Sequence, residues 1–153
     1  MNPTPIVFLS QALETDAESL VALRIDAMRE SLENIGRFDS ARVRERFLST
    51  FEPQHTRHID VDGERVGFVV VKPIDDALQL NHLYIHPRHQ GRGIGSATLK
   101  HVFEKANASM QAIHVGALRG SASNRIYQRH GFMQVNEGEW DIYYLRPQQG
   151  GAR

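Results

Sequence analysis

Apolar side chains recur along this chain with two periods, alternating with polar ones in some segments and returning every three to four residues in others. The first period is typical of strands and the second of helices. Alternating or continuous apolar runs predict strands over residues 6–9, 56–61, 65–71, 78–85, 112–118, 132–135 and 140–145. Helical spacing predicts helices over residues 15–33, 40–51, 96–108 and 123–130. Strands interspersed with helices in this order imply a mixed α/β (α+β) sheet covered on both faces.

Polar segments mark the ends of several of these elements. Thr15 and Glu18 form a T-x-x-E pattern, which predicts a capping box at the start of the first helix. Asp39 or Ser40 is suited to cap the second helix. An Asp-Gly pair at residues 62–63 lies between two strand-like runs and predicts a tight hairpin turn.

Composition limits the classes of function. The 153 residues suffice for a single domain, which we expect at residues 3–146, followed by a flexible tail at 147–153. The 18 basic and 18 acidic side chains cancel, so we expect neither nucleic acid nor a membrane surface as a partner. The absence of cysteine excludes disulfides, thiolate metal sites and a cysteine nucleophile. With no signal-like or membrane-length apolar run, the expected location is cytoplasmic.

Three glycines at alternate positions stand between the fourth predicted strand and the third predicted helix, in the stretch Gln90-Gly91-Arg92-Gly93-Ile94-Gly95. Backbone N–H groups in such a turn converge into an anion-binding nest, and the start of the helix adds partial positive charge. A phosphate-binding loop is therefore one interpretation. A plain surface turn, where glycine relieves backbone strain, is the alternative.

Two nucleotide-binding patterns fit this loop poorly. A Walker loop needs a lysine directly after its last glycine, and no lysine follows a glycine here. The dinucleotide fingerprint needs a third glycine where Ser96 stands and an acidic residue where Gln111 stands. Both nucleotide hypotheses are weakened.

The stretch "LNHLYIHPRHQGRGIGS" resembles motif A of the GNAT superfamily of acyl-CoA-dependent N-acetyltransferases, in which [QR]-x-x-G-x-[GA] joins a strand to a helix. Gln90, Gly93 and Gly95 fill its three defined positions. Farther on, "GSASNRIYQRHGF" resembles a later motif of the family, matched by Asn124, Tyr127, Gly131 and Phe132. The resemblance implies a mostly antiparallel sheet of about seven strands with about four helices, splayed between the fourth and fifth strands.

The resemblance also implies where acetyl-CoA, the expected cosubstrate, would bind. The glycine loop would hold the CoA pyrophosphate on its backbone N–H groups, and the splayed fourth strand would pair with the pantetheine arm. The loop residues implied in this are Gln90, Gly91, Arg92, Gly93, Ile94, Gly95 and Ser96, and the strand residues are Leu83, Tyr84 and Ile85. A backbone N–H of that strand would polarise the thioester carbonyl.

Two residues of the later motif carry expected roles. Tyr127 matches the tyrosine that protonates the departing thiolate, although an aromatic side chain on a short helix can also serve packing alone. Asn124 matches a residue that bonds the pantetheine amide, although it can equally be a solvated polar group.

The base that deprotonates the amine has no clear candidate. Many family members use a glutamate on the fourth strand, which here reads Leu-Gln-Leu-Asn-His-Leu-Tyr over residues 78–84. Strict alternation places Gln79 and Asn81 on the substrate side, where amides can order a water, and His82 on the other side unless a bulge intervenes. Glu30 and Glu33, at the end of the first helix, are further candidates on the acceptor side.

These observations favour an N-acetyltransferase that moves an acetyl group from acetyl-CoA to a primary amine by direct attack in a ternary complex. The alternative is a non-catalytic acyl-CoA-binding or regulatory module, favoured by the missing strand carboxylate. We expect no metal, because the spacing of His82, His86 and His89 crosses a strand end and a loop. Edge strands near the C-terminus leave a homodimer open, and the sequence does not identify the amine.

Overall fold

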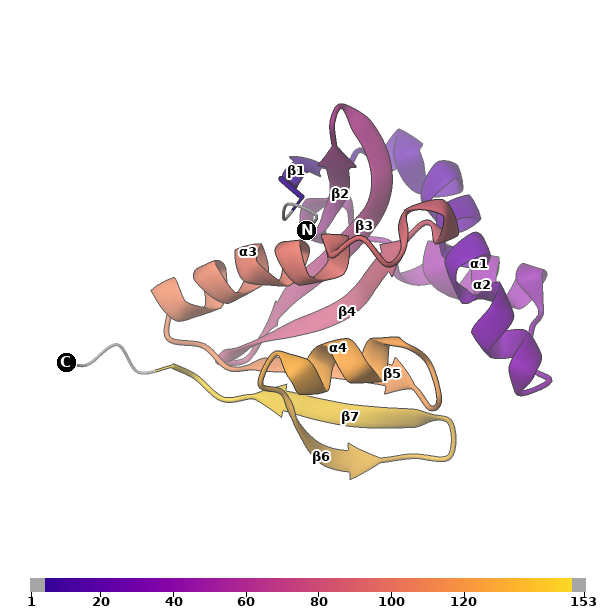
Figure 1. Ribbon diagram of the computed structural model, residues 1–153. Coiled ribbons are helices and arrows are strands. Elements are labelled where there is room, and N and C mark those ends of the chain that lie inside the picture. The colour runs from indigo at the N-terminus through magenta and orange to yellow at the C-terminus, as the bar shows by residue number, and fades with distance from the viewer. Residues whose placement is uncertain (1–4, 150–153) are drawn as a thin grey trace.

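The computed structural model describes residues 5–149 and contains seven strands and four α-helices in the predicted order (Figure 1). The strands are β1 (Phe8–Gln11), β2 (Thr56–Val61), β3 (Glu64–Ile74), β4 (Ala77–Ile85), β5 (Ile113–Leu118), β6 (Met133–Glu137) and β7 (Asp141–Arg146). The helices are α1 (Ala17–Asn34), α2 (Ser40–Thr50), α3 (Ile94–Ala108) and α4 (Ser123–Arg129). Three single 3₁₀ turns, η1 (Glu14–Asp16), η2 (Pro53–His55) and η3 (Pro87–His89), complete the list.

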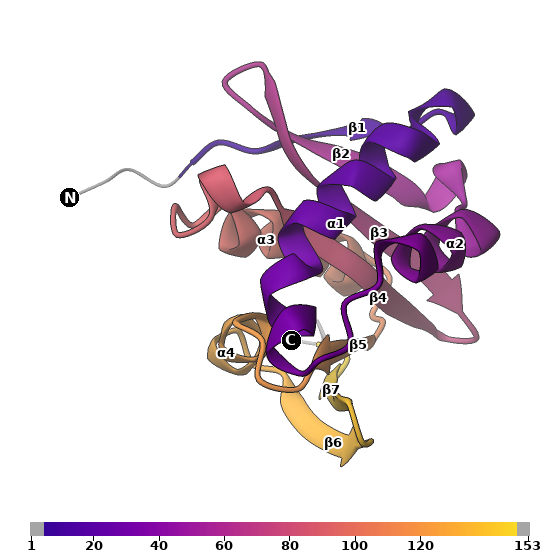
Figure 2. The same ribbon diagram turned by 90° about the vertical axis from the view of Figure 1, so that its right-hand side faces the viewer.

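All strands belong to one sheet in the order β1-β2-β3-β4-β5-β7-β6, antiparallel except for the parallel pair β4–β5. Helices α3 and α4 cover one face, where Leu99, Val102 and Tyr127 join the larger core cluster. Helices α1 and α2 cover the other face, where Leu20 and Phe47 pack in a second cluster (Figures 1 and 2). The predicted mixed α/β fold is confirmed.

The parallel pair is short, and this is what opens the sheet. Only residues 78–80 of β4 pair with residues 113–115 of β5, whereas β4 continues to Ile85 and β5 to Leu118. The two strands therefore splay over their C-terminal halves, from which the chain continues into α3 after β4 and into α4 after β5. The predicted splay between the fourth and fifth strands is present.

A β-bulge corrects the predicted alternation along β4. Val70 pairs with His82 and the next residue, Val71, pairs with Leu80, so Asn81 is an extra residue in the strand. Beyond it the side chains change faces: Leu80 and Leu83 both pack on the α3 side, whereas His82 lies among the rings of the α1–α2 side. His82 and Gln79 therefore share a face, and the prediction that His82 points away from Gln79 was wrong.

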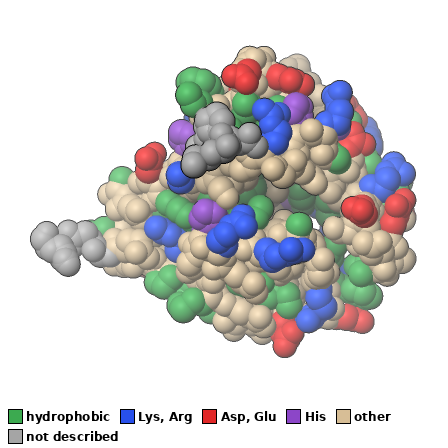
Figure 3. All heavy atoms as spheres, in the orientation of Figure 1, with side chains coloured by type: hydrophobic (Ala, Val, Ile, Leu, Met, Phe, Trp, Pro, Cys, Tyr) green, Lys and Arg blue, Asp and Glu red, His purple; other side chains and the backbone are tan. Residues whose placement is uncertain are grey.

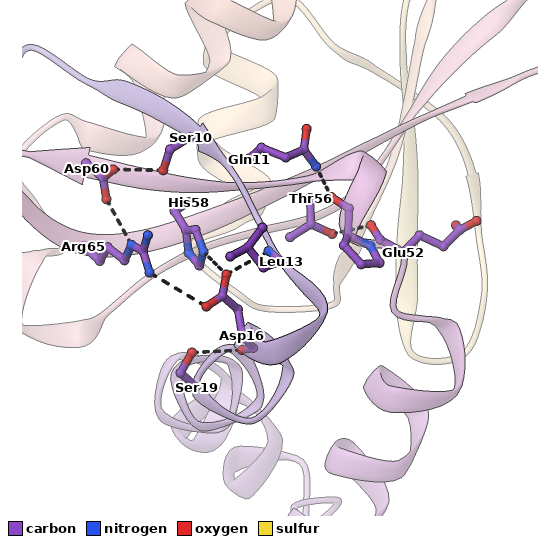
Figure 4. Close-up of polar contacts among 11 residues, drawn as sticks. Ser10, Gln11, Leu13, Asp16, Ser19, Glu52, Thr56, His58, Asp60 and Arg65 are labelled. Carbon is purple, nitrogen blue, oxygen red and sulfur yellow. Dashed lines mark hydrogen bonds and ion pairs between the residues drawn. The ribbon is translucent and has the colours of Figure 1, made fainter.

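The predicted capping box at Thr15 and Glu18 is also wrong. A 3₁₀ turn precedes α1, no side chain caps its start, and Glu18 pairs instead with Arg44 of α2. Asp16 makes the side-chain hydrogen bonds at this end of the helix. Its carboxylate accepts a hydrogen bond from the Leu13 N–H at 2.8 Å and lies 2.9 Å from His58 Nε2 (Figure 4). These bonds, the Leu13 one foremost, hold the pKa of Asp16 below its usual value.

Other predicted ends agree closely with the structure. Asp39 caps α2 by accepting a hydrogen bond from the Arg42 N–H at 3.2 Å. Asp62 and Gly63 both have positive φ, as a tight hairpin turn between β2 and β3 requires. The first predicted strand begins two residues later than expected, and residues 150–153 of the predicted tail lie outside the described part of the chain.

Candidate active site

The glycine loop joins β4 to α3, and the backbone requires two of its three glycines. Gly91 and Gly93 have φ values of 79° and 81°, in the left-handed region that side chains with a Cβ adopt only with strain. Gly93 is the residue directly before α3, so the sharp change of direction falls at the start of the helix. Gly95 is helical, and a Cβ there would lie 3.5 Å from Ile126 of α4, an ordinary contact.

This turn leaves a run of backbone donors free. The N–H groups of residues 91–96 make no hydrogen bond within residues 5–149, and the first bonded N–H of the helix is that of Ala97, which donates to Gly93 O at 3.0 Å. The predicted phosphate-binding residues Gly91 to Ser96 thus present consecutive free donors at a helix N-terminus. This is the arrangement that binds anions in other proteins.

Side-chain contacts of two histidines and of Gln90 connect the glycine loop to neighbouring parts of the fold. His89 lies 3.2 Å from the carboxylate of Glu64 through Nε2 and 2.9 Å from Arg92 through Nδ1. His86 lies 3.4 Å from Asp26 of α1. Gln90 donates its side-chain amide to Ile85 O at 2.9 Å, which ties the loop to the end of β4. These contacts fix the position of the loop. Among residues 5–149, no group of three His, Asp or Glu side chains has the arrangement of a metal site.

The surface charge around this region favours an anion. Figure 3 views the face that carries α3 and α4, and Lys and Arg side chains gather across its middle while Asp and Glu side chains lie toward its rim. The loop itself carries Arg88 and Arg92, whose charges suit an anionic ligand.

The splay supplies the second part of the site. Leu83, Tyr84 and Ile85 pair with β3 on one side, but on the side facing β5 no strand pairs with them in the described part of the chain. A ligand that enters the splay would find free peptide groups along β4, just before the glycine loop. An extended chain with amides can pair with such an edge as an added strand does.

Tyr127 lies on α4, over the splay, and is almost fully buried. Its ring packs against Phe132 and Tyr144, with centroids 5.3 and 6.0 Å away. Burial raises the pKa of Tyr127, and Tyr84 across the splay adds to the rise. The hydroxyl has no hydrogen-bond partner among residues 5–149, so it is a protonated donor still available to a ligand.

Asn124 and Ser96 are engaged within the protein by their side chains. The Asn124 amide donates to Leu118 O and Ser121 O, both at 2.9 Å, and its oxygen accepts from the Tyr144 hydroxyl at 2.7 Å. Both donors that a pantetheine amide would need are thus in use. The Ser96 hydroxyl lies 2.9 Å from His130, a contact that links α3 to α4 and leaves the Ser96 backbone N–H free.

On the opposite face of the sheet, His82 lies in an aromatic cluster with Phe47, Phe68 and Tyr84. Burial, with a smaller contribution from the charge of Arg24, lowers the pKa of His82 to about 3. Its Nδ1 is buried without a partner in the described residues. At neutral pH the ring is uncharged and far too weak a base to hold a proton from an alkylammonium group.

The remaining acceptor-side candidates are not brought together. Asn81 is exposed at the bulge, and Gln79 lies two residues earlier in β4, within the parallel pairing, opposite His114 of β5. Glu30 and Glu33 are exposed on the last turns of α1, and Glu33 lies 3.9 Å from Arg29. None of these four side chains donates to or accepts from the buried Nδ1 of His82.

Sequence reasoning missed Arg24, which faces His82 and Tyr84 from α1. The signal was present, because Arg24 falls between Leu20, Leu23 and Ala27 of the apolar stripe. A cation on the inward side of an amphipathic helix is unusual and calls for a partner.

Comparison with known proteins gives this site its context. The family model for the acetyltransferase (GNAT) domain matches residues 53–134, more than half of the chain, and includes β2 through α4. No curated protein sequence matches significantly.

Several solved structures share the fold at low identity. The PaiA N-acetyltransferase from Thermoplasma acidophilum, solved in complex with coenzyme A, is 15% identical with a TM-score of 0.76, over 93% of this chain and 99% of that one. An acetyltransferase from Thermus thermophilus is 20% identical with a TM-score of 0.72, over 96% and 99% of the two chains. The ribosomal-protein-S18-alanine N-acetyltransferase from Escherichia coli is 16% identical with a TM-score of 0.66, over 95% and 97%.

The glycine loop, the splay and the position of Tyr127 occur together in a fold shared with acetyltransferases, and the family model spans all three. This chain belongs to the GNAT family of acetyltransferases.

Proposed function

We propose that this protein transfers an acetyl group from acetyl-CoA to the primary amine of a small molecule or peptide, with both substrates bound at once. The observation that carries the proposal is that two runs of backbone groups without partners among residues 5–149 follow one another, the β5-facing edge of residues 83–85 and the N–H groups of residues 91–96. The N–H groups of residues 86 and 88–90, which lie between the two runs, are bonded within the protein. Acetyl-CoA has matching chemistry in the same order, with an amide-bearing arm followed by a pyrophosphate.

In the proposed reaction the amine nitrogen attacks the thioester carbonyl carbon from the α1–α2 side of the splay. The new C–N bond forms, and a backbone N–H of β4 stabilises the carbonyl oxygen as it gains negative charge. The C–S bond then breaks, and the departing sulfur takes the hydroxyl proton of Tyr127. Water, which takes the proton that the amine loses, returns one to the Tyr127 phenolate before the next turnover. Holding both substrates in the splay supplies much of the acceleration.

The proton on the amine needs separate treatment, because residues 77–85 of β4 include no carboxylate and His82 is too weak a base. We propose that the acceptor reacts as its free amine and loses its second proton to water. An alkylamine has a pKa near 10, so kcat/KM should rise tenfold per pH unit from about pH 6 toward that value. A plateau near pH 7 would instead point to a protein base.

The test is a screen of amines in which release of the CoA thiol is followed and the product is identified by mass. Transfer predicts thiol release that depends on one class of amine, with an acetyl group added to its nitrogen. Acetyl-CoA binding without thiol release across a broad panel would favour the non-catalytic acyl-CoA-binding module instead.

A further inference from the structure

Arg24 is a half-buried cation whose hydrogen-bonding capacity is largely unused. A guanidinium carries five N–H donors. In the structure Nε lies 3.2 Å from the thioether sulfur of Met28, a weak acceptor, and Nη1 lies 3.4 Å from Val43 O, a long contact. The remaining donors have no acceptor within residues 5–149.

No carboxylate neutralises this charge. Within residues 5–149, the arginines that form ion pairs are Arg29, Arg44, Arg65 and Arg119, and Arg24 is not among them. A solvent-exposed arginine needs no partner. A half-buried arginine loses part of its hydration free energy, and a bound anion would compensate for that loss.

The surroundings of Arg24 hold it in place for such an anion. Its guanidinium carbon lies 5.9 Å from the ring centroids of both Phe47 and Tyr84, so aromatic rings from α2 and β4 support the charged group. Next to it, His82 carries the buried Nδ1 that has no partner in the described residues. Arg24 is therefore a positioned cation on the α1–α2 side of β4, close to Tyr84 of its splayed half, whereas the Nδ1 of His82 is covered by protein atoms.

The anion cannot be the CoA phosphate in the binding mode proposed above. That phosphate would lie on the N–H groups of the glycine loop, on the α3 face, whereas Arg24 projects from α1 on the opposite face. The ligand on the α1–α2 face is the amine acceptor. A carboxylate matches the planar guanidinium with two parallel hydrogen bonds.

We propose that Arg24 binds a carboxylate of the acceptor, so that the substrates of this protein are aminocarboxylates. The inference rests on the proposed acetyl transfer. It makes Arg24 a specificity-determining residue of the acceptor site.

The experiment compares aminocarboxylates from glycine to 6-aminohexanoate, each with its own carboxamide, in the thiol-release assay. The wild type should prefer the best carboxylate over its carboxamide by at least about 10-fold in kcat/KM, because a hydrogen-bonded ion pair is lost in the amide. Arg24→Gln should raise KM for the carboxylate by about 10- to 100-fold and remove the preference, and Arg24→Lys should restore part of it.

Arg146→Gln is the matched control. Arg146 is also half-buried and lies over an aromatic ring, 4.1 Å from the centroid of Phe103, but on the α3 side of the fold. This variant should keep the preference for the carboxylate. Equal loss of carboxylate and carboxamide turnover in Arg24→Gln, or a wild type that does not distinguish them, would overturn the inference.

A binding measurement separates this inference from the proposed reaction. Calorimetry on the protein saturated with CoA should detect the N-acetylated form of the best aminocarboxylate with the wild type, and should detect at least 10-fold weaker binding with Arg24→Gln. Carboxylate binding that depends on Arg24 without any thiol release would contradict the acetyl transfer alone. Thiol release confined to amines without a carboxylate would contradict the role of Arg24 alone.

Discussion

At the scale of single residues, the environment of Tyr127 keeps its hydroxyl protonated. Its burial raises the pKa, so the hydroxyl stays protonated throughout the neutral range. We predict that Tyr127→Phe lowers kcat by about 10²-fold or more, as expected for loss of a general acid, and leaves acetyl-CoA affinity nearly unchanged because the ring still packs. Steady-state kinetics and calorimetric titration measure the two quantities. Wild-type kcat in this variant would show that Tyr127 serves packing only.

His82 gives the protein a pH-dependent stability. Its folded-state pKa of about 3 lies below the 6.5 of an unfolded chain, so between these pH values the unfolded state binds a proton and the folded state does not. The stabilisation is therefore complete above pH 6.5 and is lost as the pH falls toward 3. The loss should reach about 1.4 kcal/mol per pH unit in the free energy of unfolding between pH 6 and 4.

His82→Phe is the variant that isolates this effect, because a phenyl ring fits among Phe47, Phe68 and Tyr84 and does not titrate. Urea unfolding at a series of pH values should show a shallower slope for the variant between pH 6 and 4. Asp16, whose pKa is lowered, adds its own loss only as the pH falls below 3.8. Parallel slopes for the two proteins would contradict the burial of a neutral His82.

At the scale of elements, Asn124 connects α4 to the end of β5 and to β7 through its bonds to Leu118 and Tyr144. We predict that Asn124→Ala lowers the free energy of unfolding by about 1–3 kcal/mol, because buried polar groups lose their partners. The exposed Asn34→Ala should change it by less than about 0.5 kcal/mol. Unchanged stability together with weakened acetyl-CoA binding would instead assign Asn124 to the pantetheine arm.

The elements themselves were largely predictable, because each carries a local signal. The apolar periods located every strand and helix that the structure describes. The Asp62-Gly63 pair and the glycine loop marked turns whose positive φ values favour these residue types. The bulge at Asn81 carried no such signal. It arises from the pairing of β4 with β3, which is a contact between distant segments, and it alone decides the face on which His82 lies.

At the scale of the whole molecule, the sequence predicts much more of the proposed CoA site than of the proposed acceptor site. The proposed CoA side is built largely from one continuous stretch and one helix, so motifs reveal it. The proposed acceptor side joins α1, α2 and β4, and its chemistry depends on the position of Arg24 over Phe47 and Tyr84. A pattern along the chain does not encode that position, which depends on how α1 packs against α2 and β4.

The proposed reaction depends on the binding of acetyl-CoA to residues 91–96, and calorimetric titration of acetyl-CoA measures that binding. The wild type should bind one acetyl-CoA per chain, and NAD and ATP should not bind. Gly93→Val should weaken acetyl-CoA binding at least about 10-fold, because a branched side chain would crowd the phosphate and strain the left-handed backbone. Gly36→Val introduces similar strain at a φ of 70° away from the loop and should keep wild-type affinity. Equal affinity of Gly93→Val and Gly36→Val for acetyl-CoA, or binding of NAD or ATP in its place, would contradict the account.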